Sequence, residues 1–365
     1  MGRLLIAVAL LALACGPGQT APPAAPSGSG GSAAPPAAGA APSASAPAAG
    51  SAATAAPPAL TPIRIAYSEL TPAQYPNWVA YEYGLYAKHG LEAQLNYITS
   101  AQTTTAVIGG DVDVALGGGF AAMSSRIAGS DLVIFLGVTT FYPYEFMVTS
   151  DIASPGDLRG KTLGISRFGS SSDVGTRVAL SYLGLDPEHD VTYLQVGSLA
   201  ERFAAMKSGQ IAGGLASPPQ ITPLKKQGFK SLLDLASTGL ETLNNTGMAS
   251  AAWLRANDAT AQAFTEAIIE GFAYAANHRA ETEKVIAQYL KLDDPEAAAE
   301  AYDFYAVQHF RRVPEPALQP IREYLQDQAA TDPRMAGARA EDFIDRTYID
   351  RAVSSGYVDR TYAAY

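Results

Sequence analysis

The chain of 365 residues contains one cysteine, Cys15, and four histidines. A single cysteine excludes a disulfide within the chain and a zinc site built on cysteine pairs. The histidines lack the spacing of a zinc-binding pair, and no Gly-x-x-x-x-Gly-Lys-Ser/Thr phosphate loop is present. We therefore expect a protein that is not an enzyme and that uses no metal and no cofactor. The four histidines are His89, His189, His278 and His309.

Basic residues and long apolar runs are also scarce. The chain has 25 Lys and Arg against 35 Asp and Glu, and its formal net charge is −10. Binding a phosphate backbone requires clustered Lys and Arg, so nucleic acid is excluded as a partner. No uninterrupted apolar run reaches the roughly 20 residues that a membrane-spanning helix needs. The sequence therefore predicts no permanent membrane span.

The first residues have the layout of a signal peptide. Arg3 precedes an apolar run over residues 4–14, and Cys15 follows, with Gly16 next. The segment Leu11–Cys15 resembles a bacterial lipobox, whose cysteine is lipidated. We therefore expect residues 1–15 to direct export, Cys15 to carry a lipid anchor, and the protein to be extracytoplasmic at the cell membrane. An ordinary secretory signal with a chance cysteine is the alternative.

Residues 16–61 are almost wholly Ala, Pro, Ser, Gly and Thr, with no charged or aromatic residue. Such a composition cannot bury a core, so we expect a disordered linker. The remaining chain, at about 100–200 residues per domain, has room for two lobes.

From residue 63 onward, segments with strand character alternate with helical patterns, which predicts an α/β fold with mainly parallel sheets covered by helices. Leu132–Leu136 is apolar on both faces, as a central parallel strand should be. After about residue 251 only helical patterns remain, which predicts a helical C-terminal block. The expected strands are 63–67, 92–97, 112–116, 131–138, 162–166, 191–196, 211–216 and 231–235.

Several motifs resemble those of one family of periplasmic solute-binding proteins, which includes binders of alkanesulfonates, taurine, thiamine precursors and riboflavin. Residues 78–91 resemble its signature A-x-E-x-G-[FLY]-[FY]-x-x-x-G-L. The resemblance extends over roughly residues 63–333, with one departure at Ala212, where the family's second Gly-x-x-Asp pattern has Asp. Further matching segments follow in family order at 106–113, 152–164, 169–173 and 184–192.

The resemblance implies a two-lobed periplasmic-binding-protein fold that closes around a ligand and delivers it to the permease and ATPase of an ABC importer. It implies crossings between lobes near 143–149 and 238–249, a first lobe of 62–142 and 243–365, and a second lobe of 146–239. The similar segments Gly110–Gly117 and Gly209–Leu215 mark either two similar lobes or merely two similar helix-to-strand turns.

Ligands of open α/β sheets bind beyond the carboxyl ends of strands, so the residues there are candidates for the site. Aromatic rings can stack on a planar ligand, and small residues at a helix start can hold an oxygen. The alternative roles are core packing for the aromatics and helix capping for the serines. The candidates are Tyr67, Tyr75, Asn77, Trp78, Gly118, Phe120, Tyr142, Tyr144, Arg167, Phe168, Ser170, Ser171, Ser172 and Glu241.

Aromatic residues outnumber basic residues in these loops, which favours a planar heterocycle of the vitamin class, riboflavin first and a thiamine-type pyrimidine next. The first alternative is an alkanesulfonate or taurine, held by Arg167 and the helix start at Ser170–Ser172. The second is a sensory lipoprotein that keeps the fold without a role in transport.

Overall fold

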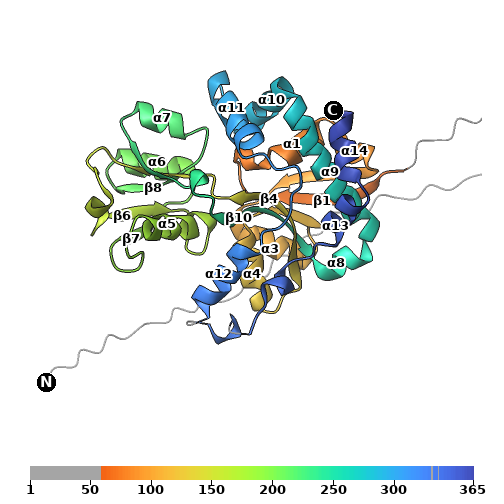
Figure 1. Cartoon of the computed structure of the whole chain (residues 1–365), viewed down its shortest axis with the longest axis horizontal. Coiled ribbons are helices and arrows are strands. Elements are labelled where there is room, and N and C mark those ends of the chain that lie inside the picture. The colour runs from red at the N-terminus through yellow and green to blue at the C-terminus, as the bar shows by residue number, and fades with distance from the viewer. Residues whose placement is uncertain (1–58, 330–331, 336) are drawn as a thin grey trace, which may run out of the picture. The chain divides into compact units, whose positions relative to one another are not determined.

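The computed structural model describes residues 59–329, 332–335 and 337–365 (Figure 1). The expected signal segment, Cys15 and nearly all of the expected linker lie outside the described residues. Within the described ranges, no helix is both long enough and apolar enough to cross a membrane.

The first sheet has five strands in the order β2-β1-β3-β10-β4. β1 pairs in parallel with β2 and β3, whereas β10 runs antiparallel between β3 and β4. Ile63 and Ile65 of β1 are fully buried, as the alternating pattern predicts. The strands are β1 (Thr61–Tyr67), β2 (Leu91–Tyr97), β3 (Val114–Gly117), β4 (Leu132–Phe141) and β10 (Glu241–Ser250).

The second sheet repeats this order as β7-β6-β8-β5-β9. β6 pairs in parallel with β7 and β8, and β5 runs antiparallel between β8 and β9. All eight strands expected from the sequence are present across the two sheets. The strands here are β5 (Glu145–Val148), β6 (Thr162–Ile165), β7 (Thr192–Gln195), β8 (Gly213–Ala216) and β9 (Lys230–Asp234).

The sequence did not predict β5 and β10, because their segments were expected to form the crossings between lobes. The chain instead crosses at residues 142–144 and 235–240, and β10 joins the first sheet from Glu241 onward. After each crossing the chain returns to the buried interior, where its backbone N–H and C=O groups need hydrogen-bond partners. Pairing with a neighbouring strand supplies these partners, so a strand begins directly after each crossing. Each sheet is therefore mixed, with one strand opposed to the other four.

The shared strand order also favours the reading of two similar lobes. β3 and β8 hold the same place in their sheets, each after a helix and a glycine with positive φ. These glycines, Gly110 at φ +75° and Gly209 at φ +74°, adopt the left-handed conformation that ends a helix.

Helices follow most strands, and in Figure 1 α5, α6 and α7 accompany the second sheet. The helices before β10 are α1 (Tyr75–Glu82), α2 (Leu85–Lys88), α3 (Ser100–Gly109), α4 (Gly119–Ile127), α5 (Ser171–Tyr182), α6 (Leu199–Lys207) and α7 (Ile221–Lys226).

The expected helical C-terminal block is present and packs with the first sheet and its helices. α9 packs on α1, α12 on β10 and α13 on β4. These helices are α8 (Ala251–Ala256), α9 (Asp258–Asn277), α10 (Arg279–Leu290), α11 (Pro295–Tyr302), α12 (Gln319–Gln328), α13 (Thr347–Ser354) and α14 (Tyr357–Ala364).

Candidate functional site

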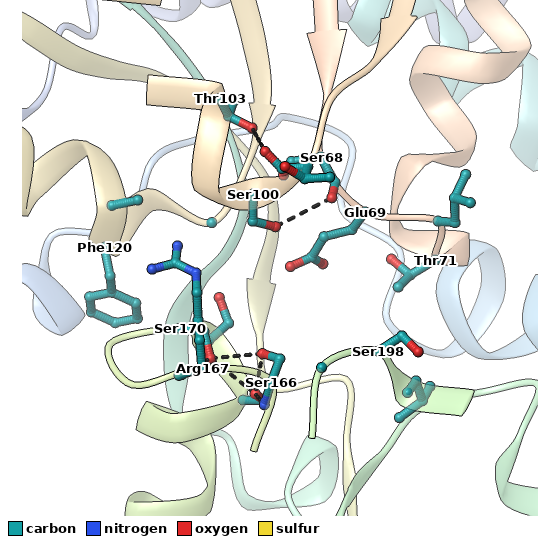
Figure 2. A pocket seen from close by; sticks show the side chains of 18 of the residues that line it. Ser68, Glu69, Thr71, Ser100, Thr103, Phe120, Ser166, Arg167, Ser170 and Ser198 are labelled. Carbon is teal, nitrogen blue, oxygen red and sulfur yellow. Dashed lines mark hydrogen bonds between the residues drawn. The ribbon is translucent and has the colours of Figure 1, made fainter. Parts of the chain in front are cut away.

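A cavity of about 500 Å³ lies at the carboxyl ends of strands from both sheets (Figure 2). Its walls include the loops after β1, β2 and β3 of the first sheet and after β6, β7 and β8 of the second. Four helices begin at this wall, with Ser100 of α3, Gly118 before α4, Ser171 of α5 and Leu199 of α6 among the lining residues. Helix N-termini present free N–H groups and positive dipole ends, so the cavity favours a negatively charged group.

The start of α5 shows which serines have a structural role. Ser170 is the N-cap residue, and its hydroxyl accepts a hydrogen bond from the Asp173 backbone N–H. The Ser172 hydroxyl accepts from the Ser166 backbone N–H at 2.9 Å. Ser171 also lines the cavity, and its hydroxyl has no hydrogen bond within the described part of the chain. Ser171 is therefore the serine of this turn that is free to bind a ligand.

Two arginines from the side of the second sheet line the cavity. Arg167 follows β6, and Figure 2 shows its guanidinium pointing into the cavity. Arg202 of α6 is only 6% exposed, and its Nη1 donates to the Gly197 carbonyl at 2.9 Å. The Arg202 Nε has no hydrogen-bond partner among the described residues, and burial lowers the Arg202 pKa. A buried guanidinium whose Nε–H has no partner among the described residues is suited to an anionic ligand.

An acidic side chain, Glu69, enters the same cavity from the first sheet, directly after β1 (Figure 2). Burial raises the Glu69 pKa to about 7, and the positive charge of Arg202 partly opposes this shift. Within the described ranges, no hydrogen bond or ion pair satisfies its carboxylate. The cavity thus combines two cations with one acid.

Three aromatic rings border the cavity, those of Tyr97, Phe120 and Tyr144. Tyr144 lies on the crossing between the sheets, and its hydroxyl accepts a hydrogen bond from the Asn244 amide at 2.5 Å. Burial raises the Tyr144 pKa well above its usual range, so this hydroxyl stays neutral. Tyr97 is half exposed at the end of β2.

The structure brings together half of the residues that the sequence nominated. The nominated residues that line the cavity are Gly118, Phe120, Tyr144, Arg167, Ser170, Ser171 and Ser172.

Four nominated residues near α1 lie in the core instead. Trp78 is fully buried and stacks on Tyr289, with ring centroids 4.6 Å apart. Tyr67 packs edge-on against Trp78, and Tyr75 packs edge-on against Phe272. Asn77 is also fully buried, and its side-chain oxygen accepts a hydrogen bond from the Tyr86 hydroxyl at 2.6 Å.

Three further nominated residues also lie away from the cavity. Tyr142 belongs to a core cluster of the second sheet. Phe168 is 52% exposed and meets the edge of Tyr193. Glu241 lies 3.6 Å from Arg311, in an ion pair with exposed partners. We do not include these three, or the four core residues, in the proposed site.

Glu69, Tyr97 and Arg202 were not singled out from the sequence. Glu69 lies directly after β1, at a strand end of the kind where the sequence analysis expects ligands to bind. Arg202 had one local signal, because it lies in the first turn of α6, where a cation opposes the helix dipole. Such a position suggests a role other than helix stability.

Two sheets that meet at a cavity beyond their carboxyl ends define a periplasmic-binding-protein fold, and the chain is of the solute-binding class rather than an enzyme. Residues 71–282, more than half of the chain, match the family described as NMT1/THI5 like. The chain belongs to this family of ABC-type solute-binding proteins.

Individual proteins are similar to this chain in sequence or in fold. The chain is 28% identical over 265 residues to the binding protein YtlA of Bacillus subtilis (strain 168), covering 68% of this chain and 77% of YtlA. Its fold is similar to that of the alkanesulfonate-binding protein SsuA from Xanthomonas axonopodis pv. citri bound to MOPS, at TM-score 0.61 and 19% identity, covering 81% and 99% of the two chains. It is also similar to the nitrate-binding protein NrtA from Synechocystis PCC 6803, at TM-score 0.65 and 14% identity, covering 81% and 89%.

Proposed function

We propose that this chain is the solute-binding subunit of an ABC importer for a small organic anion, with sulfonates as the favoured class. The observation that carries the proposal is the pair Arg167 and Arg202 at a cavity where four helices begin. Among the described residues, the Arg167 guanidinium has no hydrogen bond and the Arg202 Nε has no partner. Charge-assisted hydrogen bonds to an oxyanion would use these donors and the helix N-termini together.

The size of the cavity supports an organic ligand over a bare inorganic anion. A volume of about 500 Å³ lies within the range usual for small-molecule sites. Phe120, Leu199 and Met248 supply apolar surface in the same wall. An anion with a short carbon chain can therefore place its charged end at the arginines and its chain against these side chains. The SsuA structure, described as alkanesulfonate-binding and bound to MOPS, shows that a similar fold holds such a ligand.

A planar heterocycle, riboflavin or a thiamine-type pyrimidine, is the second candidate. The rings of Tyr97, Phe120 and Tyr144 at the cavity favour it. It has less support than the anion, because Tyr67, Tyr75 and Trp78, on which the sequence argument partly depended, pack in the core.

We further propose that the protein acts outside the cytoplasm, anchored through a lipid on Cys15, and delivers its ligand to a permease and an ATPase. Labelling of the full chain with radioactive palmitate tests the anchor. Label on the natural chain and none on Cys15→Ser is the expected result. Equal labelling of both would contradict the anchor and leave the ligand site unaffected. A sensory role would be favoured if ligand bound tightly but deletion of the protein left uptake unchanged.

Thermal unfolding of the Cys15→Ser chain tests the ligand class. Propane-1-sulfonate should raise the unfolding temperature, and ethyl methyl sulfone, a similar but uncharged molecule, should not, because it lacks the charge that the arginines bind. Saturable quenching of riboflavin fluorescence, with no response to the sulfonate, would replace the anion by the second candidate.

A further inference from the structure

We propose that residues 303–315, which we call the hinge strap, hold the two crossings between the sheets and limit the movement of one lobe against the other. The His309 ring, stacked on Phe141, is the contact through which the strap acts. This inference goes beyond the proposed function, because it concerns the motion of the lobes and does not depend on which ligand the cavity binds.

The strap begins in a rare kind of helical turn. It follows α11 with the π-helix η4 (Asp303–Gln308) and continues without helix or strand to Glu315. A π-helical turn is uncommon and is frequently found at functional sites. Here it brings the rings of Phe304 and Tyr305 to the Phe141 ring, at centroid distances of 6.0 and 6.2 Å. The turn therefore packs on the end of β4.

The first crossing starts directly after Phe141, the last residue of β4, and the strap holds this residue. His309 stacks on the Phe141 ring, with centroids 4.5 Å apart and an angle of 25° between the planes. The Phe304 ring lies 4.7 Å from the same imidazole. Earlier in β4, the Gly137 N–H donates to the Pro314 carbonyl at 2.8 Å. The strap is thus fixed to β4 up to the point where the chain leaves the first sheet.

The strap also lies beside both ends of the second crossing. The Arg311 Nη1 lies 3.6 Å from a carboxylate oxygen of Glu241, the first residue of β10 and the first after this crossing. Asp234 is the last residue of β9 in the second sheet, and its charge opposes the fall in the His309 pKa that burial causes. The His309 ring therefore lies near the ends of strands from both sheets.

This position allows the strap to restrict how the lobes move. Closure of a two-lobed protein is absorbed by backbone changes at a few residues between the lobes. The stacked rings fix the end of β4, so rotation is confined to the short crossings at 142–144 and 235–240. Fewer arrangements of the ligand-free lobes then remain, and less conformational freedom is lost when a ligand binds.

Distances between spin labels on the two lobes test this inference without a ligand. The chain has one cysteine, so in the Cys15→Ser chain Glu92→Cys on β2 and Ser181→Cys on α5 provide two exposed label sites. We expect His309→Ala to broaden the distance distribution of the ligand-free chain. His309→Phe, which still stacks, should leave it unchanged.

Ligand affinity provides the second measurement. The affinity for propane-1-sulfonate should fall roughly threefold or more in His309→Ala, because a smaller fraction of the chain is ready to bind. His309→Phe should bind as the natural chain does. His189→Ala is the matched control, since it removes an exposed histidine outside the strap and the crossings.

Each outcome decides a different point. An unchanged distance distribution in His309→Ala would overturn the inference. Equal broadening in His309→Ala and His309→Phe would also overturn it, because the stacked ring would then not be the contact that acts. Absence of propane-1-sulfonate binding to the natural chain would contradict the proposed function, while the distance comparison would still decide the role of the strap. If His309→Ala fails to fold, His309→Leu replaces it, since leucine fills the space without a flat face.

Discussion

Glu69 and Arg202 follow strands of different sheets, yet both line one cavity, and the charge of Arg202 partly opposes the rise in the Glu69 pKa. The two groups are therefore near enough to interact, although they form no ion pair in the described part of the chain. The cavity therefore places a titratable acid beside the arginines that are proposed to bind the anion.

The Glu69 pKa of about 7 predicts a pH-dependent affinity for anions. Glu69 is mostly protonated at pH 6 and mostly ionised at pH 8, and its ionisation adds a negative charge to the cavity that Arg167 and Arg202 line. The affinity for propane-1-sulfonate should therefore be higher at pH 6 than at pH 8, and Glu69→Gln should remove most of this dependence. Parallel titrations of both chains at three pH values would measure this. The same slope for both chains would contradict the role of Glu69.

Replacement of Arg202 by methionine should weaken sulfonate binding at least tenfold, because it removes a buried charged donor. Stability should be kept or increased, since an apolar chain of similar length replaces a buried cation. Lys207→Met, in the exposed last turn of the same helix, is the control and should bind normally. Calorimetry and thermal unfolding of both variants measure the two effects. Unchanged affinity in Arg202→Met would remove Arg202 from the site.

Two adjacent serines should separate stability from binding. Ser170→Ala removes the N-cap of α5 and should cost about 1 kcal/mol of unfolding free energy. Ser171→Ala removes a hydroxyl that faces the cavity without a hydrogen bond in the described ranges, so it should lower affinity and leave stability within about 0.5 kcal/mol. Urea unfolding and ligand titration of each variant provide the comparison. The reverse pattern would assign the ligand contact to Ser170.

Gly271 of α9 lies so close to α1 that no side chain fits. A Cβ at this position would lie 2.3 Å from the Pro76 carbonyl oxygen. Gly271→Ala should therefore destabilise the fold by about 1–3 kcal/mol, because the two helices must move apart. At Gly156 the nearest atom would be 3.8 Å away, and Gly156→Ala should be nearly neutral. Equal stability of the two variants in urea would show that the α1–α9 contact adapts easily.

The strands and the helical C-terminal block were predictable because their patterns are local, with alternating or continuous apolar residues and glycines at helix ends. β10 was not, because its sequence is polar and includes Thr242, Asn244 and Thr246. These side chains are buried. The Thr246 hydroxyl donates to the Gly117 carbonyl at 3.0 Å, a partner distant in the sequence. Only the assembled sheet shows that such a polar segment can form an inner strand, between β3 and β4.

The site was partly predictable for the same reason. The rule that ligands bind after strand ends is local, and Arg167 and the three nominated serines at the start of α5 do line the cavity. An aromatic residue in such a loop can equally enter the core, and Trp78 does so because Tyr289, far along the chain, stacks on it. The importance of Glu69 and Arg202 depends on groups that have no hydrogen-bond partner among the described residues, the Glu69 carboxylate and the Arg202 Nε, and a sequence does not show this.

The most direct test of the central claim is calorimetric titration of propane-1-sulfonate into the Cys15→Ser chain and into the same chain with Arg167→Met and Arg202→Met. The account predicts saturable one-to-one binding to the first and none to the second, with both chains folded by thermal unfolding. Absence of binding to the first chain, or equal binding to both, would contradict the claim that these arginines make the cavity an anion site.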